Sequence, residues 1–220
     1  MYIPKHYRIE DQVKLLAFMR ANSFATLVSS QAEALLASHL PFVIVSSASR
    51  GAITLLGHMA RANPQWKTFA EGREVMVIFQ GPHAYISPAF YSSKVNVPTW
   101  NYAAVHAYGM PHILSGDSVE AVITSVIDSF QPSYRSQYDD LPADYKRNML
   151  NGIVAFEIPV TRLEGKRKLS QNKTLGEQRR IADTLVADHD QVTAGVGRLM
   201  QENLRDEAGR SVIGLERRLP

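Results

Sequence analysis

Five β-like runs follow one another between residues 24 and 87, and only short polar or glycine-bearing links separate them. They read FATLVSS, EALLASHLPFVIV, AITLLGHMA, EVMVIFQ and HAYIS. Many strands with few intervening helices do not make a doubly wound parallel sheet, which requires a helix after nearly every strand. The pattern therefore predicts a mainly β (α+β) fold, a barrel or sandwich with helical decorations.

Composition is ordinary for a globular protein, with 220 residues, 45% hydrophobic and 20% charged. This length predicts one large domain with an appendage, which we place at residues 1–165 and 166–220. The chain has no cysteine, which excludes disulfides, thiolate metal sites and a cysteine nucleophile. The cytoplasm is the expected location, and no apolar run approaches the ~20 residues of a membrane span.

Helix signals surround the strands. A helical pattern runs from about Tyr7 to Asn22, and Asn63 with Pro64 predicts the start of another helix. Further strands are expected at 101–110 and at 153–160, where Pro159 indicates an edge or a strand end. Capping boxes are expected at Asp117–Glu120 and Thr174–Glu177, and a last helix from about Gln191 is weakened by Gly195 and Gly197.

One segment is chemically unusual. Residues 80–102 read QGPHAYISPAFYSSKVNVPTWNY and interleave aromatic rings with hydrogen-bonding groups. Flat side chains beside polar groups suit a planar ligand with polar edges. A surface loop pinned by aromatics and a subunit contact are the alternatives.

A second segment, LLGHMARANPQWKTF at 55–69, brings His58 and Arg61 to the predicted helix start at Asn63. Free N–H groups at a helix start and a guanidinium favour a phosphate, although an ordinary capped helix has the same pattern. Together the two segments would suit a phosphorylated planar cofactor, and both flavin mononucleotide (FMN) and pyridoxal phosphate fit. A nicotinamide dinucleotide would require a glycine-rich βαβ turn, which the sequence lacks.

A basic stretch contains Arg162, Lys166, Arg167, Lys168 and Lys173, opposed only by Glu164. It could face phosphate on a cofactor or on nucleic acid, but a solvated linker is the interpretation that we favour. No nucleophile elbow, zinc motif or P-loop occurs, and the histidines lack metal-ligand spacing. We therefore assign no catalytic or metal residues, while a single axial histidine leaves haem open.

At these residues the chain resembles the PaiB family of FMN-binding negative transcriptional regulators. The resemblance is carried by MYIPKHY, SHLPFV, GHMARANPQW, the aromatic segment and KLSQNK, and it spans most of residues 1–190. It implies the split-barrel flavin-binding fold, in which a six-stranded Greek-key barrel dimerises and holds FMN at the subunit interface.

The resemblance also implies site residues. His58, Arg61 and Asn63 would hold the FMN phosphate or ribityl chain. Trp66, Tyr85, Trp100 and Asn101 would border the ring or the dimer contact, with Lys94 and Thr99 as further candidates. Ser170, Gln171 and Asn172, with Lys173, would complete the site.

Four functions remain in competition. The first is an FMN-binding transcriptional regulator, and the second is an FMN-dependent oxidoreductase in which the protein orients the flavin. The third is direct DNA binding through the basic stretch and the C-terminal helices, although the acidic Asp188 and Asp190 between those helices would repel phosphate. The fourth is a haem-binding split barrel. The residues leave both a regulator and an enzyme open.

Overall fold

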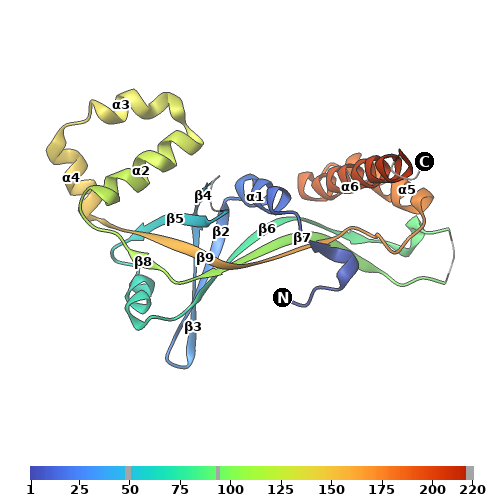
Figure 1. Ribbon diagram of the computed structural model, residues 1–220, viewed down its shortest axis with the longest axis horizontal. Helices are drawn as coiled ribbons and strands as arrows, with labels where there is room; N and C mark the ends of the chain where they lie inside the picture. Colours follow the sequence, from blue (N-terminus) through green and yellow to red (C-terminus); the bar gives the residue numbers. More distant parts are fainter. Residues whose placement is uncertain (48–50, 93–94, 217–220) are drawn as a thin grey trace. The chain divides into compact units, whose positions relative to one another are not determined.

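The computed structural model describes residues 1–47, 51–92 and 95–216, the stretch 207–216 by its backbone alone (Figure 1). Packing divides the chain into two units that are interleaved along the sequence. Unit 1 consists of Met1, Glu10–Gln80 and Val105–Glu164, and unit 2 of Tyr2–Ile9, Gly81–Ala104 and Gly165–Pro220. The expected division into residues 1–165 and 166–220 stays a prediction.

The described residues form a nine-stranded sheet in the order β3-β2-β6-β7-β9-β5-β4, with β1 and β8 paired to β9. The strands are β1 (Arg8–Ile9), β2 (Phe24–Gln31), β3 (Ala34–Pro41), β4 (Val43–Ser46), β5 (Ile53–Ala60), β6 (Val75–Ile86), β7 (Thr99–Gly109), β8 (His112–Ile113) and β9 (Ile153–Lys168). Every register given for the described residues is antiparallel. The expected antiparallel sheet with helices is therefore confirmed, and the expected number of six strands is wrong.

The difference in strand number has local causes. Two strands, β1 and β8, have only two residues each, which is too short for a periodic signal. The run at 33–45 is broken at Phe42 into β3 and β4, while the runs EVMVIFQ and HAYIS form one continuous strand, β6. The hydrogen-bonded order is open, and its two ends, β3 and β4, are joined through Phe42.

The expectation that Pro159 marks an edge or a strand end is also wrong. Strand β9 continues past this residue to Lys168, and it lies between β7 and β5 in the sheet order. The pairing of β9 with β5 does end here, opposite Thr54. The missing N–H of proline therefore comes at the end of that ladder, where it disturbs the pairing least.

The core of unit 1 contains three phenylalanines that are at most 1% exposed: Phe42, Phe79 and Phe156. The Phe42 ring meets the other two edge to face, with centroids 6.1 and 6.2 Å away, a favourable arrangement for aromatic pairs. Gly57 on β5 allows this packing, because a Cβ there would lie 2.9 Å from the Phe156 ring and 3.0 Å from Phe42.

Polar side chains cap some of the helices and not others. Helix α1 (Gln12–Ala21) is capped by Asp11 and begins later than the expected start near Tyr7, because Arg8–Ile9 form β1 and Lys5–Tyr7 form a separate 3-10 helix, η1. The predicted box at Asp117–Glu120 is wrong, because α2 (Asp117–Phe130) is capped by Gly116 at φ 59° without a side-chain bond. The box of Thr174 and Glu177 is confirmed at α5 (Leu175–Val186).

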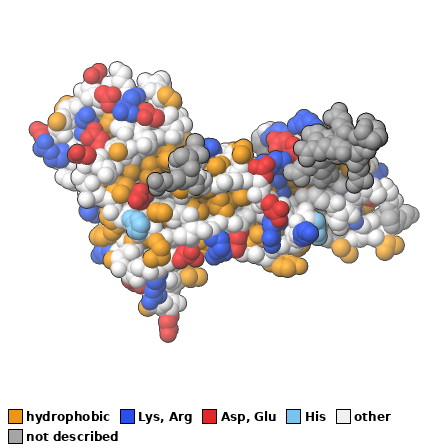
Figure 2. All heavy atoms as spheres, viewed as in Figure 1, with side chains coloured by type: hydrophobic (Ala, Val, Ile, Leu, Met, Phe, Trp, Pro, Cys, Tyr) orange, Lys and Arg blue, Asp and Glu red, His pale blue; other side chains and the backbone are white. Residues whose placement is uncertain are grey.

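Unit 1 also carries a group of short helices that the sequence did not predict. After α2 come η4 (Pro132–Tyr134), α3 (Arg135–Asp139) and α4 (Ala143–Asn151). Their surface mixes acidic and basic side chains (Figure 2), and Arg135, for example, bridges Asp128 and Asp139. Within the described residues, no helix has the length and apolar character needed to cross a membrane.

In unit 2, helices α5 and α6 (Gln191–Glu216) lie side by side (Figure 1). Their apolar residues pack on Ala84, Ile86 and Leu169 of the sheet segments. The glycines of α6 are packing positions: a Cβ at Gly195 would lie 2.8 Å from Pro82, and one at Gly197 would meet α5. One face of these sheet segments is therefore covered by the two helices.

Candidate functional site

The predicted site residues fall into two sets, one in each unit. Unit 1 contains His58, Arg61, Asn63 and Trp66, and unit 2 contains Tyr85, Thr99, Trp100, Asn101, Ser170, Gln171 and Asn172. Lys94 lies outside the described residues.

In unit 1 the predicted helix start is present. Asn63 caps η2 (Pro64–Glu71), a 3-10 helix, and its Oδ1 accepts from the Gln65 N–H at 3.0 Å. Its Nδ2 donates to the Ser38 hydroxyl at 2.8 Å. Both polar ends of the Asn63 side chain are thus engaged within the chain.

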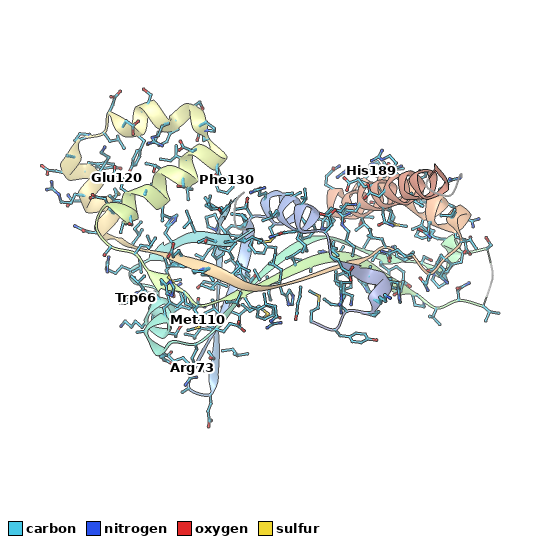
Figure 3. The ribbon with its side chains drawn as sticks, viewed as in Figure 1. Trp66, Arg73, Met110, Glu120, Phe130 and His189 are labelled. Carbon is cyan, nitrogen blue, oxygen red and sulfur yellow. The ribbon has the colours of Figure 1, made fainter. Side chains whose placement is uncertain are left out.

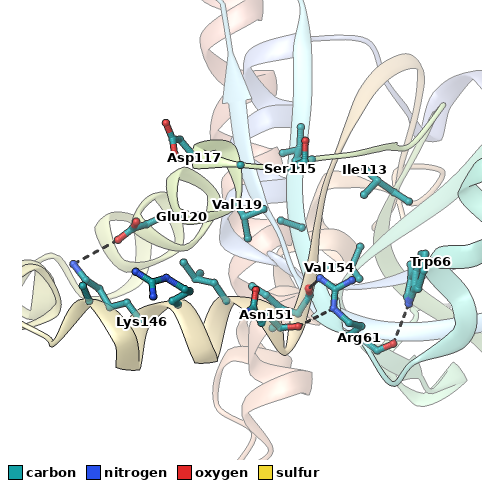
Figure 4. A pocket seen from close by; sticks show the side chains of 17 residues that line it. Arg61, Trp66, Ile113, Ser115, Asp117, Val119, Glu120, Lys146, Asn151 and Val154 are labelled. Carbon is teal, nitrogen blue, oxygen red and sulfur yellow. Dashed lines mark hydrogen bonds and ion pairs between the residues drawn. The ribbon is translucent and has the colours of Figure 1, made fainter.

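Arg61, which follows β5, fastens two distant parts of unit 1. Its Nε donates to the Asn151 carbonyl and its Nη2 to the Ile153 carbonyl, both at 2.7 Å. The Trp66 indole N–H in turn donates to the Arg61 carbonyl at 3.0 Å (Figure 4). A guanidinium has five N–H donors, so Arg61 keeps three for another acceptor while its position is fixed.

Arg61 and Trp66 line a cavity of about 710 Å³ together with the start of α2 and the length of α4 (Figure 4). Trp66 is set in η2 and Glu120 in α2 (Figure 3). In the cavity wall the Lys146 ammonium lies 3.6 Å from Glu120. The wall therefore combines an indole, aliphatic side chains and charges of both signs.

His58 lies on β5 and is half-buried. Its Nδ1 is buried and has no hydrogen-bond partner among the described residues. Burial lowers the pKa of this imidazole, so the ring is held in its neutral form. An unpaired ring nitrogen of this kind is free to bond a ligand.

In unit 2 two aromatic side chains of the unusual segment are exposed. Tyr85 on β6 is 50% exposed and Trp100 on β7 is 53% exposed. The Tyr85 and Trp100 ring centroids are 6.1 Å apart at 74°, an edge-to-face arrangement, and the His83 ring centroid lies 6.1 Å from that of Trp100. This exposed group of rings offers apolar surface with polar edges.

Thr99 and Trp100 are tied to the end of β9. The Lys168 ammonium donates to the Thr99 hydroxyl and, at 2.8 Å, to the Trp100 carbonyl. Burial and the nearby Lys166 charge lower the pKa of Lys168. The cation therefore lies at the edge of the aromatic group.

Asn101 differs from its neighbours because it is 0% exposed. Its Nδ2 donates to the Ser170 hydroxyl at 2.9 Å, and that hydroxyl lies 3.2 Å from the Asn101 Oδ1. Ser170 adopts φ 62°, a left-handed conformation that non-glycine residues seldom adopt. The structure thus gives Asn101 a part in holding a strained turn.

Gln171 closes that turn. Its Oε1 accepts from the Leu169 N–H at 2.7 Å, and its Nε2 donates to the Arg167 carbonyl at 2.8 Å. Asn172 is exposed at the tip of the turn. Of these two predicted residues, Asn172 is therefore the more accessible to a ligand.

The interpretation of the basic stretch as a solvated linker is wrong, because Arg162–Lys168 belong to β9. Lys166 is only 7% exposed. The spacing of Lys166 and Lys168 on either side of Arg167 could have indicated a strand, because residues two apart share one face of a strand. No group of three metal-ligating side chains is found in the part of the chain that the structure describes.

Comparison with known proteins decides the family. Residues 1–162 match a family model described as "Putative FMN-binding domain". The chain belongs to this family. The Bacillus subtilis "Protease synthase and sporulation protein PAI 2" is 34% identical over 209 residues, which is 94% of this chain and 100% of that protein. An uncharacterized Emericella nidulans protein is 33% identical over 218 residues, 82% of this chain and 80% of its own. The expected PaiB membership and FMN as cofactor are therefore confirmed.

Solved structures confirm the fold. The FAD and haem binding protein of Mycobacterium smegmatis superimposes with a TM-score of 0.61 at 16% identity, covering 78% of each chain. The flavocytochrome Anf3 of Azotobacter vinelandii gives 0.60 at 13% identity, covering 76% of this chain and 72% of that one. At such identities the likeness concerns the fold alone, which is of the split-barrel type.

Each unit, taken by itself, carries groups of a kind that FMN requires. His58 has an unpaired buried nitrogen, and Tyr85 and Trp100 offer bare rings. Arg61 keeps unused N–H donors. These are the groups that a planar, polar-edged, anionic molecule requires.

Proposed function

We propose that this protein binds FMN on the exposed aromatic side chains of unit 2 and uses the flavin in regulation. The observation that carries the proposal is the exposed pair of Tyr85 and Trp100, whose rings lie 6.1 Å apart at the surface of unit 2. Large aromatic rings are normally buried, and a bare group of them marks a surface that awaits a ligand or a partner.

Each set has a role that can be tested by itself. Trp100 and Tyr85 would supply apolar contact to the isoalloxazine ring, and Thr99 would fix the Lys168 ammonium nearby. His58 and Arg61 would bond phosphate or ribityl oxygens. Asn101, Ser170 and Gln171 would set the shape of the turn from which Asn172 is presented.

Bound FMN would supply a redox centre that accepts and returns electrons. The chain's own residues orient the ring, exclude water from one of its faces and present hydrogen-bond donors to its polar edge. Neutral His58 could donate or accept one hydrogen bond according to its tautomer.

Regulation is proposed from the relative. The Bacillus subtilis protein is named a protease synthase and sporulation protein, and for this chain we propose negative control of transcription in the cytoplasm, as the resemblance to the PaiB family implies. Regulation through direct contact with DNA is less well supported. Asp188 and Asp190 lie between α5 and α6, where Asp190 caps α6, and their carboxylates would repel the DNA phosphates. Binding to a DNA duplex that weakens steeply with added salt would support it.

An oxidoreductase is the second candidate, because the exposed rings of Tyr85 and Trp100 leave room for a further small molecule. Bleaching of the flavin by NADPH, with turnover, would favour it over regulation alone. We also propose a homodimer with FMN at the subunit interface, which sedimentation of the loaded protein would show as a doubled mass.

The test is a fluorescence titration of apoprotein with FMN. Trp100→Ala should weaken FMN about tenfold or more, since stacking on an aromatic ring is worth about 1–3 kcal/mol. Phe130→Ala is the matched control, because Phe130 is also 53% exposed but lies on α2 of unit 1. If Trp100→Ala kept wild-type affinity for FMN, the ring bed would be wrongly placed.

A further inference from the structure

Three cations share one face of the sheet in unit 2. Lys166 and Lys168 are two residues apart on β9, so both side chains leave the same face of the strand. Arg8 on β1 is the direct antiparallel partner of Lys166, and directly opposed residues also lie on one face. Arg167 points to the other face, where it meets Glu202 of α6 at 3.6 Å.

Within the described residues, no carboxylate forms an ion pair with Arg8, Lys166 or Lys168, although other basic residues of the same strand are paired. Like charges placed opposite one another destabilise a sheet. Proteins keep such unfavourable local arrangements chiefly at functional sites.

The position of Lys166 makes the arrangement still less favourable. Lys166 is only 7% exposed. The ammonium has one hydrogen bond, to the Tyr2 carbonyl at 3.1 Å, and lies 5.0 Å from the centre of the Tyr102 ring. This carbonyl and the rings of Tyr102 and Tyr2, the second at 5.7 Å, compensate a buried charge only in part.

The aromatic group lies beside these cations. Lys168 bonds the Trp100 carbonyl, and Tyr102 under Lys166 follows Trp100 on the same face of β7. Rings and unpaired cations on one face match a ligand that is flat at one end and anionic at the other. The opposite face is covered by α5 and α6, so the ligand would approach this face alone.

We propose that Arg8, Lys166 and Lys168 form a site for the phosphate group of a nucleotide whose ring lies on the aromatic group of unit 2. Arg8 is exposed and Lys168 is partly exposed, so these two contact the phosphate. Lys166 acts through its charge. The phosphate belongs either to FMN itself, in which case the inference rests on the proposed function and these cations replace His58 and Arg61 as the phosphate contacts, or to a second nucleotide that approaches the flavin.

The experiment compares ligands with and without phosphate. FMN, riboflavin, NADPH and inorganic pyrophosphate are titrated into wild type, Lys168→Gln, Arg8→Gln and Arg179→Gln. Arg179 is an exposed residue of α5, which covers the other face, so its variant makes the same charge change elsewhere in unit 2. Circular dichroism and thermal melts check that each variant is folded.

If FMN is the source, Lys168→Gln weakens FMN about tenfold or more and leaves riboflavin within about twofold, as expected for loss of a charge-assisted bond. If a second nucleotide is the source, the same variant spares both flavins and weakens NADPH and pyrophosphate. Lys168→Arg should restore the phosphate preference in either case.

The proposal is overturned if Lys168→Gln and Arg8→Gln each leave all four ligands within about twofold of wild type, or if Arg179→Gln has an equal effect. The pyrophosphate titration separates this result from failure of the proposed function. If the wild type binds neither flavin, but binds pyrophosphate more tightly than Lys168→Gln does, the phosphate site is supported and FMN binding is refuted.

Discussion

Asn101 offers the sharpest separation between a structural residue and a cofactor contact. Family resemblance places it at the flavin, whereas the structure buries it completely and bonds it to Ser170. Asn101→Ala removes both contacts with the Ser170 hydroxyl, whose remaining interaction among the described side chains is with Tyr91. At about 1 kcal/mol per hydrogen bond, with a further cost for the poorly satisfied hydroxyl, the free energy of unfolding should fall by about 2–3 kcal/mol.

The assay is urea unfolding of the apoprotein, because bound ligand would itself stabilise the folded state. A double-mutant cycle of Asn101→Ala with Ser170→Ala isolates the pair, and we expect a coupling of about 1–2 kcal/mol. The reasoning would be refuted if Asn101→Ala changed the unfolding free energy by less than about 0.5 kcal/mol while FMN affinity fell about tenfold. That result would make Asn101 a direct ligand contact.

Three further predictions concern other parts of the molecule. Arg61→Gln should weaken FMN by about 1.5–3 kcal/mol through loss of a charge-assisted bond, while Arg73→Gln, at an exposed site on the same unit, should leave the titration unchanged. Gly109→Ala should destabilise the folded protein by about 1–3 kcal/mol or more, because a Cβ at this position would overlap the backbone of β9. Gly176→Ala should stabilise it by about 0.5–1 kcal/mol, because α5 has open space at this position. Equal melting temperatures of the two variants would count against both expectations. The pKa of the Glu177 carboxyl is lowered, chiefly because the carboxylate accepts a hydrogen bond from the Ser92 N–H. The stabilisation that this carboxylate contributes is therefore present above about pH 4.3 and is lost as the pH falls through the lowered pKa. Glu177→Gln should therefore flatten the acid limb of stability against pH, and an unchanged limb would exclude this carboxyl as its source.

The strands were predictable because alternation is a local signal. In β5, for example, buried and partly exposed residues alternate from Ile53 to Met59, as the sequence pattern indicated. The break at Phe42 was not predictable, because it depends on that ring packing against Phe79 and Phe156. Similarly, Asp117 carries a capping signal, but Gly116 takes the cap position instead.

The site was predictable as segments and not as contacts. The aromatic segment and the segment around Arg61 were recognised from their residue types. The bonds of Arg61 reach carbonyls about 90 residues further along the chain, and no local pattern encodes such partners. Lys166 and Lys168 could have been recognised as a strand face from their spacing, but the position of Arg8 opposite Lys166 depends on pairing with β1.

Whether this chain carries FMN on its exposed aromatic surface can be read from the visible absorption spectrum of the protein. We expect the protein as purified, or after addition of FMN and removal of the excess, to show the yellow flavin absorption with the Trp100 emission quenched. A colourless protein that also fails to retain added FMN would contradict the account.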